Sequence, residues 1–284
     1  MVSWPSTLIT ELAERRVVMF LGAGLSKAAH GAMPSWTNLL EQMAEKVLLK
    51  KDQDLIKKLI RYGRLLDAAE LINSQILPAD RRAILEKKFR LNPAPISNIY
   101  EDILSLDPKI CITTNYDQLI EKNFEYFSGG TSAHQVRIFT YNNLISDLRS
   151  PARVILKVHG CVTDTSNIVL DRKSYFNAKA DNPGVYETIK ALCTVNTVLF
   201  IGYSMGDPDI QLVLEDINAK AKSDHRHYAL VPKFEHPSLR EANKHTYNVD
   251  FIEYAKDRHD LVPAALSELK DAVVATRASS GARV

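Results

Sequence analysis

Short apolar runs alternate along the chain with longer segments in which apolar residues recur at helical spacing. The runs predict buried strands, and they lie within residues 17–22, 109–117, 137–141, 152–160, 168–170, 197–209, 227–232 and 249–255. Segments such as 6–15 and 35–51 place apolar side chains every three or four residues, as one face of a helix does. This alternation predicts an α/β fold, a Rossmann-like doubly wound parallel sheet covered by helices on both faces.

One long stretch departs from the alternation. Residues from about 40 to 95 contain few strand formers and predict several helices in succession, which we interpret as a helical insertion. The last predicted helix ends at residue 276, and the polar segment 277–284 is expected to be a flexible tail. The chain is therefore predicted to form one domain over residues 1–276 that contains the insertion.

The composition narrows the function classes only a little. The chain is 45% hydrophobic and 25% charged with a net charge of +2, which gives no sign of a strongly basic nucleic-acid binder. No apolar run approaches the roughly 20 residues of a membrane span, and the N-terminus lacks a secretory pattern, so a cytoplasmic protein is expected. Cys111, Cys161 and Cys193 form no C-x-x-C pair, which argues against a structural zinc site, and no metal is expected.

Four of the apolar runs end in small or polar residues. These are "FLGAGLS", "CITTNYD", "ILKVHG" and "LFIGYSMGDPD". In an open parallel sheet, ligands bind outside the carboxyl ends of the strands. We therefore expect the four ends to converge on one crevice, and this shared placement is more informative than any single motif.

The first motif contains a glycine pair and a serine, Gly22, Gly24 and Ser26. Such glycines let main-chain N–H groups approach a pyrophosphate closely, and the serine hydroxyl can donate to a phosphate oxygen. A glycine turn without any ligand explains the same residues nearly as well. The pattern G-x-G-x-x-G is incomplete because position 27 is lysine, and no acidic residue ends a strand about 20 residues later, so a hydride-transferring Rossmann domain is poorly supported.

The second and third motifs supply candidate polar groups. Asn115 is expected in the site, whereas Asp117, taken alone, is better explained as the cap of the helix that follows it. His159 ends a strongly apolar strand, where a general base would lie, and imidazole suits proton transfer near neutral pH.

The fourth motif repeats the pattern of the first. Gly202 and Ser204 again combine a glycine with a hydroxyl just after an apolar strand. Asp207 and Asp209 surround a proline at the start of a predicted helix, and we interpret both as helix caps.

Taken in order, the four motifs resemble the catalytic domain of the sirtuin family over roughly residues 10–260. In that family a G-A-G-x-S loop cradles the cofactor phosphates, a T-x-N-x-D motif and a histidine before glycine flank the nicotinamide ribose, and a later G-x-S loop contacts the adenosine side. The resemblance implies catalytic roles for Asn115, Asp117 and His159, and NAD-binding roles for Gly22, Ala23, Gly24, Ser26, Thr114, Gly202 and Ser204.

Several departures change what the resemblance implies. Protein-deacylating sirtuins carry a four-cysteine zinc module after the histidine, whereas residues 161–195 contain two isolated cysteines. The segment after the first loop is "GAMPSWTNLL", with Trp36 in the place of the family's aromatic residue and no arginine, and Thr114 stands where deacylases usually have glutamine. These features resemble the bacterial sirtuin-like branch of antiviral defence systems, whose members hydrolyse NAD.

The resemblance therefore implies an NAD+ hydrolase that acts as an abortive-infection effector. Asn115 would position a water or the ribose, His159 would act as general base, and Asp117 would orient the nicotinamide side. Because a free NAD+ hydrolase depletes its own cell, we expect gating by a homo-oligomer or by a partner, such as the HerA-type hexameric ATPase found with relatives. The alternatives are an NAD-dependent protein deacylase and a module that senses NAD or ADP-ribose without turnover. Both hydrolysis and cyclisation to cyclic ADP-ribose are compatible with these residues.

Overall fold

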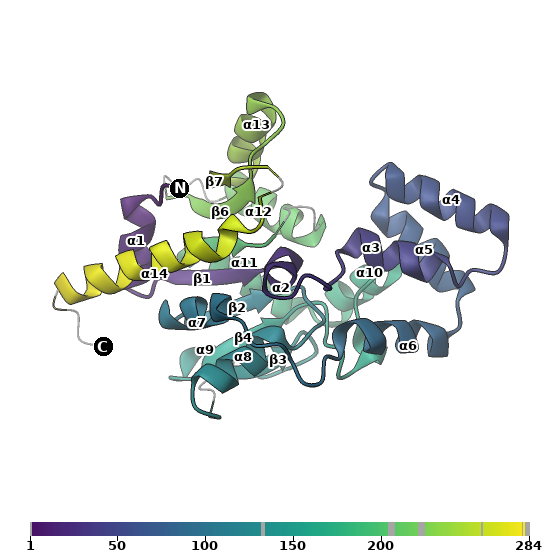
Figure 1. Cartoon of the computed structure of the whole chain (residues 1–284), viewed down its shortest axis with the longest axis horizontal. Helices are drawn as coiled ribbons and strands as arrows, with labels where there is room; N and C mark the ends of the chain where they lie inside the picture. Colours follow the sequence, from purple (N-terminus) through teal and green to yellow (C-terminus); the bar gives the residue numbers. More distant parts are fainter. Residues whose placement is uncertain are drawn as a thin grey trace.

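The computed structural model describes residues 2–131, 134–203, 208–220, 225–256, 258–279 and 281. Its centre is a parallel sheet whose seven strands lie in the order β3-β4-β2-β1-β5-β6-β7 (Figure 1). The strands are β1 (Val17–Leu21), β2 (Ile110–Thr113), β3 (His134–Ile138), β4 (Arg153–Lys157), β5 (Thr197–Ile201), β6 (His227–Pro232) and β7 (Val249–Tyr254). The predicted α/β class with a doubly wound parallel sheet is confirmed.

Successive side chains of the central strands pack against opposite layers of helices. In β1, Val18 and Phe20 belong to one buried cluster, and Met19 and Leu21 belong to the other. Because side chains alternate across a strand, a run with no polar residue is the pattern that a strand buried on both faces requires. The strand β1 is accordingly buried along its whole length.

The helices divide between these two faces. Helices α1 (Ser6–Ala13), α2 (Ala23–Ala29), α7 (Asn98–Ser105), α8 (Leu119–Phe127) and α14 (Leu261–Ser279) contribute to the cluster that contains Met19. The cluster that contains Phe20 takes its helical residues from α9 (Leu144–Arg149), α10 (Arg172–Asp181), α11 (Pro183–Val195) and α12 (Pro208–Lys220), with α13 (Pro237–Tyr247) beside them.

Four consecutive helices separate α2 from α7. They are α3 (Trp36–Ala44), α4 (Lys50–Arg61), α5 (Leu65–Gln75) and α6 (Pro78–Phe89), and Figure 1 shows α4 and α5 at the right, away from the sheet. Their buried residues, such as Leu40, Ile56 and Ile72, belong to the same apolar cluster as one face of the sheet. The helical segment is therefore packed continuously against the rest of the chain.

The structure corrects two expectations. Residues 168–170 were expected to form a strand but form none, although the Val169 N–H donates to the His159 carbonyl (3.0 Å). The tail was expected to begin at residue 277, but α14 continues to Ser279. The physical reason is Arg277, whose guanidinium donates to the carbonyls of Leu12 and Leu106 (both 2.8 Å). These carbonyls lie near the ends of α1 and α7, so Arg277 satisfies helix-terminal acceptors and holds the last turn of α14 in place.

Candidate functional site

The four motif-bearing strand ends lie side by side. Strands β4, β2, β1 and β5 are consecutive neighbours in the sheet, and all of them are parallel. Their carboxyl ends therefore form one edge, to which Ser26, Asn115, His159 and Gly202 each contribute from a different strand end. The strand order confirms that the four strand ends share one edge, which coincides with the place where the chain crosses from one half of the sheet to the other, and the crevice expected there stays a prediction.

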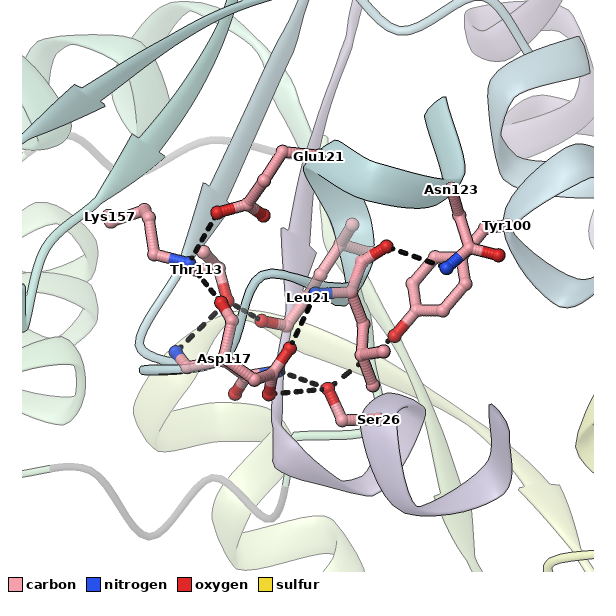
Figure 2. Close-up of polar contacts among 10 residues, drawn as sticks. Leu21, Ser26, Tyr100, Thr113, Asp117, Glu121, Asn123 and Lys157 are labelled. Carbon is pink, nitrogen blue, oxygen red and sulfur yellow. Dashed lines mark hydrogen bonds and ion pairs between the residues drawn. The ribbon is translucent and has the colours of Figure 1, made fainter. Parts of the chain in front are cut away.

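Ser26 connects the first and second motifs by hydrogen bonds (Figure 2). Its hydroxyl donates to Asp117 Oδ2 (2.9 Å). Its oxygen accepts from the amide Nδ2 of Asn115 (3.0 Å). The Tyr100 hydroxyl lies 3.5 Å from the same oxygen. Because the single hydroxyl hydrogen of Ser26 is directed to Asp117, only lone pairs face Asn115, and the amide must present its NH2 group to Ser26.

This constraint determines where the other end of the Asn115 amide lies. Asn115 is 6% exposed, and its Oδ1 is buried without a hydrogen-bond donor among the described residues. Buried polar atoms are nearly always paired, and open parallel sheets bind ligands at their carboxyl edge, so a carbonyl oxygen in this position has the properties of a group that accepts from a substrate hydroxyl or a water.

Asp117 has two roles at once. Its Oδ1 accepts from the Leu119 N–H (3.0 Å) at the start of α8, and its Oδ2 accepts from Ser26. The bond to the Leu119 N–H forms an Asx turn just before α8, but the N-cap residue of this helix is Gln118, so the interpretation of Asp117 as the cap itself is wrong by one residue; its other carboxylate oxygen is bonded to Ser26. The carboxylate also raises the pKa of the Tyr100 hydroxyl, for which burial is the larger cause.

A second buried group, which sequence reasoning missed, contacts the same residue. Lys157 at the end of β4 is 0% exposed, and its Nζ donates to the main-chain carbonyl of Asp117 and pairs with Glu121 Oε1 (3.0 Å) (Figure 2). Burial alone lowers the pKa of Lys157, but the negative charges around it, led by Glu121, outweigh burial and raise it overall. A lysine inside the apolar run "VILKVHG" was the available signal, because lysine is almost never fully buried without a partner.

The turn that carries Asn115 is also tied to β1. The Thr113 hydroxyl donates to the Leu21 carbonyl (2.6 Å) and accepts from the Asn115 N–H (3.1 Å). Thr114 follows Thr113 at the same edge and is half-buried. Its predicted contact with NAD stays a prediction.

His159 lies just beyond β4 and is 3% exposed. Its ring meets the ring of Tyr175, from α10, edge-on with centroids 4.9 Å apart. The Tyr175 ring stacks in turn against Trp36 (6.5 Å), whose indole nitrogen is buried without an acceptor among the described residues. The aromatic residue after the glycine loop thus lies beside the histidine, joined to it through a tyrosine that sequence reasoning did not single out.

The glycines of the first and fourth motifs pack directly against each other. The Gly24 N–H donates to the Gly202 carbonyl (2.7 Å), and the Gly22 N–H donates to the Ile201 carbonyl (2.9 Å). Gly202 has a φ of +65°, and a Cβ placed on it would lie 2.1 Å from the Leu25 nitrogen. These glycines are required for the close approach of two loops. Contact of Gly22, Ala23 and Gly24 with phosphate stays a prediction, and Ser204 and Asp207 lie outside the described residues.

The described residues offer neither a metal site nor a membrane-spanning helix. No group of three or more histidine, cysteine or acidic side chains is arranged to hold a metal ion. None of the helices within the described ranges is long and apolar enough to cross a membrane. Burial raises the pKa of both Cys111 and Cys193 to about 12, which leaves these thiols unreactive at neutral pH.

Comparison with known proteins identifies the family. The model of the SIR2-like domain matches residues 109–252, slightly more than half of the chain. The chain belongs to the SIR2-like domain family. Within this SIR2-like range lie Asn115, Asp117, Lys157 and His159, whereas the Gly22–Ser26 loop precedes it.

The SIR2-like chain is also similar to curated bacterial proteins. It is 29% identical over 221 residues to NAD(+) hydrolase ThsA of Enterococcus faecium, covering 76% of this chain and 43% of that protein. It is 28% identical over 218 residues to Defense-associated sirtuin 2 of Bacillus subtilis, covering 72% and 20% of the two proteins. For NAD(+) hydrolase ThsA of Bacillus cereus the identity is 28%, with 79% and 45% covered. The chain thus spans less than half the length of each of these relatives.

Proposed function

We propose that this protein hydrolyses NAD+ to nicotinamide and ADP-ribose. The observation that carries the proposal is the buried Oδ1 of Asn115, which has no hydrogen-bond donor among the described residues and is held in one orientation by Ser26 at the carboxyl edge of the sheet. The names of the ThsA relatives, and a departure from the deacylase pattern after His159, favour NAD+ itself as the molecule that is cleaved.

The residues suit the chemistry of this reaction. Cleavage of the bond between nicotinamide and ribose passes through an oxocarbenium-like state that carries positive charge on the ribose. Asn115 Oδ1 accepts a hydrogen bond from a ribose hydroxyl or the attacking water and so positions it. His159 removes the proton, and the Asp117 carboxylate, held by Ser26 and Leu119, places negative charge beside the developing cation and orients the nicotinamide side.

The remaining site residues belong to the same proposal. The loops of Gly22, Ala23, Gly24 and Ser26 and of Gly202 and Ser204, with Thr114, line the binding site for the rest of the dinucleotide. Residues 1–276 act as one catalytic unit that includes the helical insertion, and α14 continues beyond residue 276 to Ser279.

The proposal includes a role in antiviral defence, with the activity gated by assembly or by a partner protein. The defence role is supported by the similarity to Defense-associated sirtuin 2. Gating is supported by exposed apolar side chains on the helical insertion, where Leu48 is 93% exposed and Tyr62 is 69% exposed. Burial of such side chains against a second chain would remove apolar surface from water and so favour association.

The test is the release of nicotinamide from NAD+ by the purified chain, alone and with candidate partners, with separation of ADP-ribose from cyclic ADP-ribose. Asn115→Ala and His159→Ala are each expected to abolish release without loss of the folded state, as judged by circular dichroism and thermal unfolding. Phe176→Ala is a matched control, since this side chain is 72% exposed and belongs to no described contact of the site. Full activity of both site variants would refute the assignment, and turnover of an acetyl-peptide instead of NAD+ alone would favour a deacylase.

A further inference from the structure

Lys157 is the fully buried cation of the central sheet, and the proposed mechanism above does not use it. It ends β4, whose other buried residues are apolar, and its side chain is 0% exposed. Transfer of an ammonium group into such a place is costly unless the group is paired and hydrogen-bonded. The groups that pair with Lys157 therefore decide its role.

Its partners lie in the segment that carries the site. The Nζ donates to the main-chain carbonyl of Asp117, the residue whose carboxylate receives the Ser26 hydroxyl (Figure 2). The other end of the same turn is held by Thr113, whose hydroxyl donates a hydrogen bond to the Leu21 carbonyl. The turn between Thr113 and Leu119 is thus attached to β1 at one end and to β4 at the other. Asn115 lies between the two attachments.

The charges around Lys157 explain how a cation is tolerated here. Glu121, at 3.0 Å, cancels the charge of Lys157, and its own side chain is only 11% exposed. Among the described residues, the partners of the Asp117 carboxylate oxygens are the Ser26 hydroxyl and the Leu119 N–H, and neither is a cation. The cluster of Lys157, Glu121 and Asp117 therefore keeps one net negative charge on the side that faces Ser26 and Asn115.

We propose that Lys157 is a positioning residue of this site. By donating to the Asp117 carbonyl it fixes the turn that orients Asn115 Oδ1. Because its charge is neutralised by Glu121, the negative charge of Asp117 remains available to the reaction. This inference rests on the proposed function for its kinetic readout but not for its structural one. The residue acts through Asp117 and Asn115 and does not itself contact the substrate.

The test replaces both members of the ion pair together, because removal of Lys157 alone would leave the buried Glu121 carboxylate without a cation. In Lys157→Met/Glu121→Met the pair becomes two apolar side chains of similar size. We expect a folded protein with kcat for nicotinamide release lowered at least about 30-fold and KM changed less than about threefold. Amide hydrogen exchange at residues 114–119 should rise at least about tenfold, with β1 and β5 unchanged. A matched control is Arg137→Met/Asp147→Met, which removes a similarly close pair (2.5 Å) between β3 and α9 and should keep wild-type kinetics.

The outcomes separate the two proposals. A folded double variant with kcat within threefold of the wild type, or with unchanged exchange at residues 114–119, would overturn the role of Lys157. A second pair, Lys157→Gln/Glu121→Gln, keeps buried hydrogen bonding but loses the reach to Asp117, and it should show the same losses. If neither pair variant folds, Lys157 serves stability and the inference is wrong. If wild-type protein releases no nicotinamide under any condition, the proposed function fails, and the exchange measurement still decides whether Lys157 holds the turn.

Discussion

The substitution Asp117→Asn changes one carboxylate oxygen into an NH2 group while it keeps the shape of the side chain. In the wild type, Oδ1 accepts from the Leu119 N–H and Oδ2 accepts from the Ser26 hydroxyl. In the variant, the amide oxygen keeps the bond to Leu119, so the new NH2 group faces Ser26 and donates to it. The Ser26 hydrogen is then displaced. The Tyr100 hydroxyl, at 3.5 Å, can accept it only at a long distance, whereas Asn115, at 3.0 Å, accepts it once the amide turns over.

The magnitude follows from the cost of leaving that hydrogen unpaired. A buried polar group without a partner costs about 1–3 kcal/mol. The flipped amide, with its NH2 group pointing into the site, is favoured by this amount. Since about 1.4 kcal/mol corresponds to a factor of ten, the fraction of correctly oriented Asn115 falls about 5- to 150-fold. We expect kcat for nicotinamide release to fall by at least this factor, because the carboxylate charge is lost as well, while the melting temperature changes little.

The assay is steady-state release of nicotinamide, with Asp147→Asn as a control that removes a carboxylate bonded to Arg137 outside the site. A double-variant cycle tests the route of the effect. If Asp117 acts through Ser26, then Ser26→Ala/Asp117→Asn should be no slower than Asp117→Asn alone, because the conflicting hydrogen is gone. The reasoning is refuted if folded Asp117→Asn has a kcat within twofold of the wild type, or if the two substitutions slow the reaction additively.

Three further predictions concern stability. Gly202→Ala should lower the free energy of unfolding by several kcal/mol, because φ is +65° and the new Cβ would lie 2.1 Å from main-chain atoms. Gly184→Ala in α11, where the space around the residue is open, should be neutral or stabilising by up to about 1 kcal/mol. Urea unfolding of both variants measures the difference. Burial lowers the pKa of His227 to about 4, and its Nδ1 accepts from the Val198 N–H, so the unfolded chain binds the proton more readily between about pH 4 and 6.5 and the free energy of unfolding rises with pH through this window. The wild type should lose about 2 kcal/mol of stability from pH 7.5 to 5 through this residue. His227→Asn keeps an acceptor that does not protonate, so its loss over the same range should be smaller by about 2 kcal/mol. Arg277→Ala should cost about 1–3 kcal/mol by leaving helix-terminal carbonyls without donors and should speed amide exchange in the last turn of α14, whereas equal stability and exchange in variant and wild type would contradict the role given to this guanidinium.

The amino-acid sequence by itself determined the parallel sheet and the sheet edge at which the candidate site lies. A run such as Val17–Leu21 with no polar residue is compatible with burial on both faces, and its alternation with helices leaves few other folds. Four small or polar strand ends then had to lie at one edge, because strands that run parallel end on the same side. These inferences depend only on local pattern, and local pattern is what sequence periodicity records.

The tertiary structure decided what those residues do to one another. Ser26 and Asn115 are 89 residues apart, and their hydrogen bond, which orients the amide, depends on the order in which the strands assemble. The same is true of Lys157, whose charge within an apolar strand signalled a partner without naming Asp117 or Glu121. Gly22 and Gly24 are a further case. They were expected to approach a phosphate, and in the structure the main chain of Gly202 lies so close to them that neither position has room for a side chain. Hydrogen-bond direction, charge balance and close approach arise between distant segments, so no spacing along the chain specifies them.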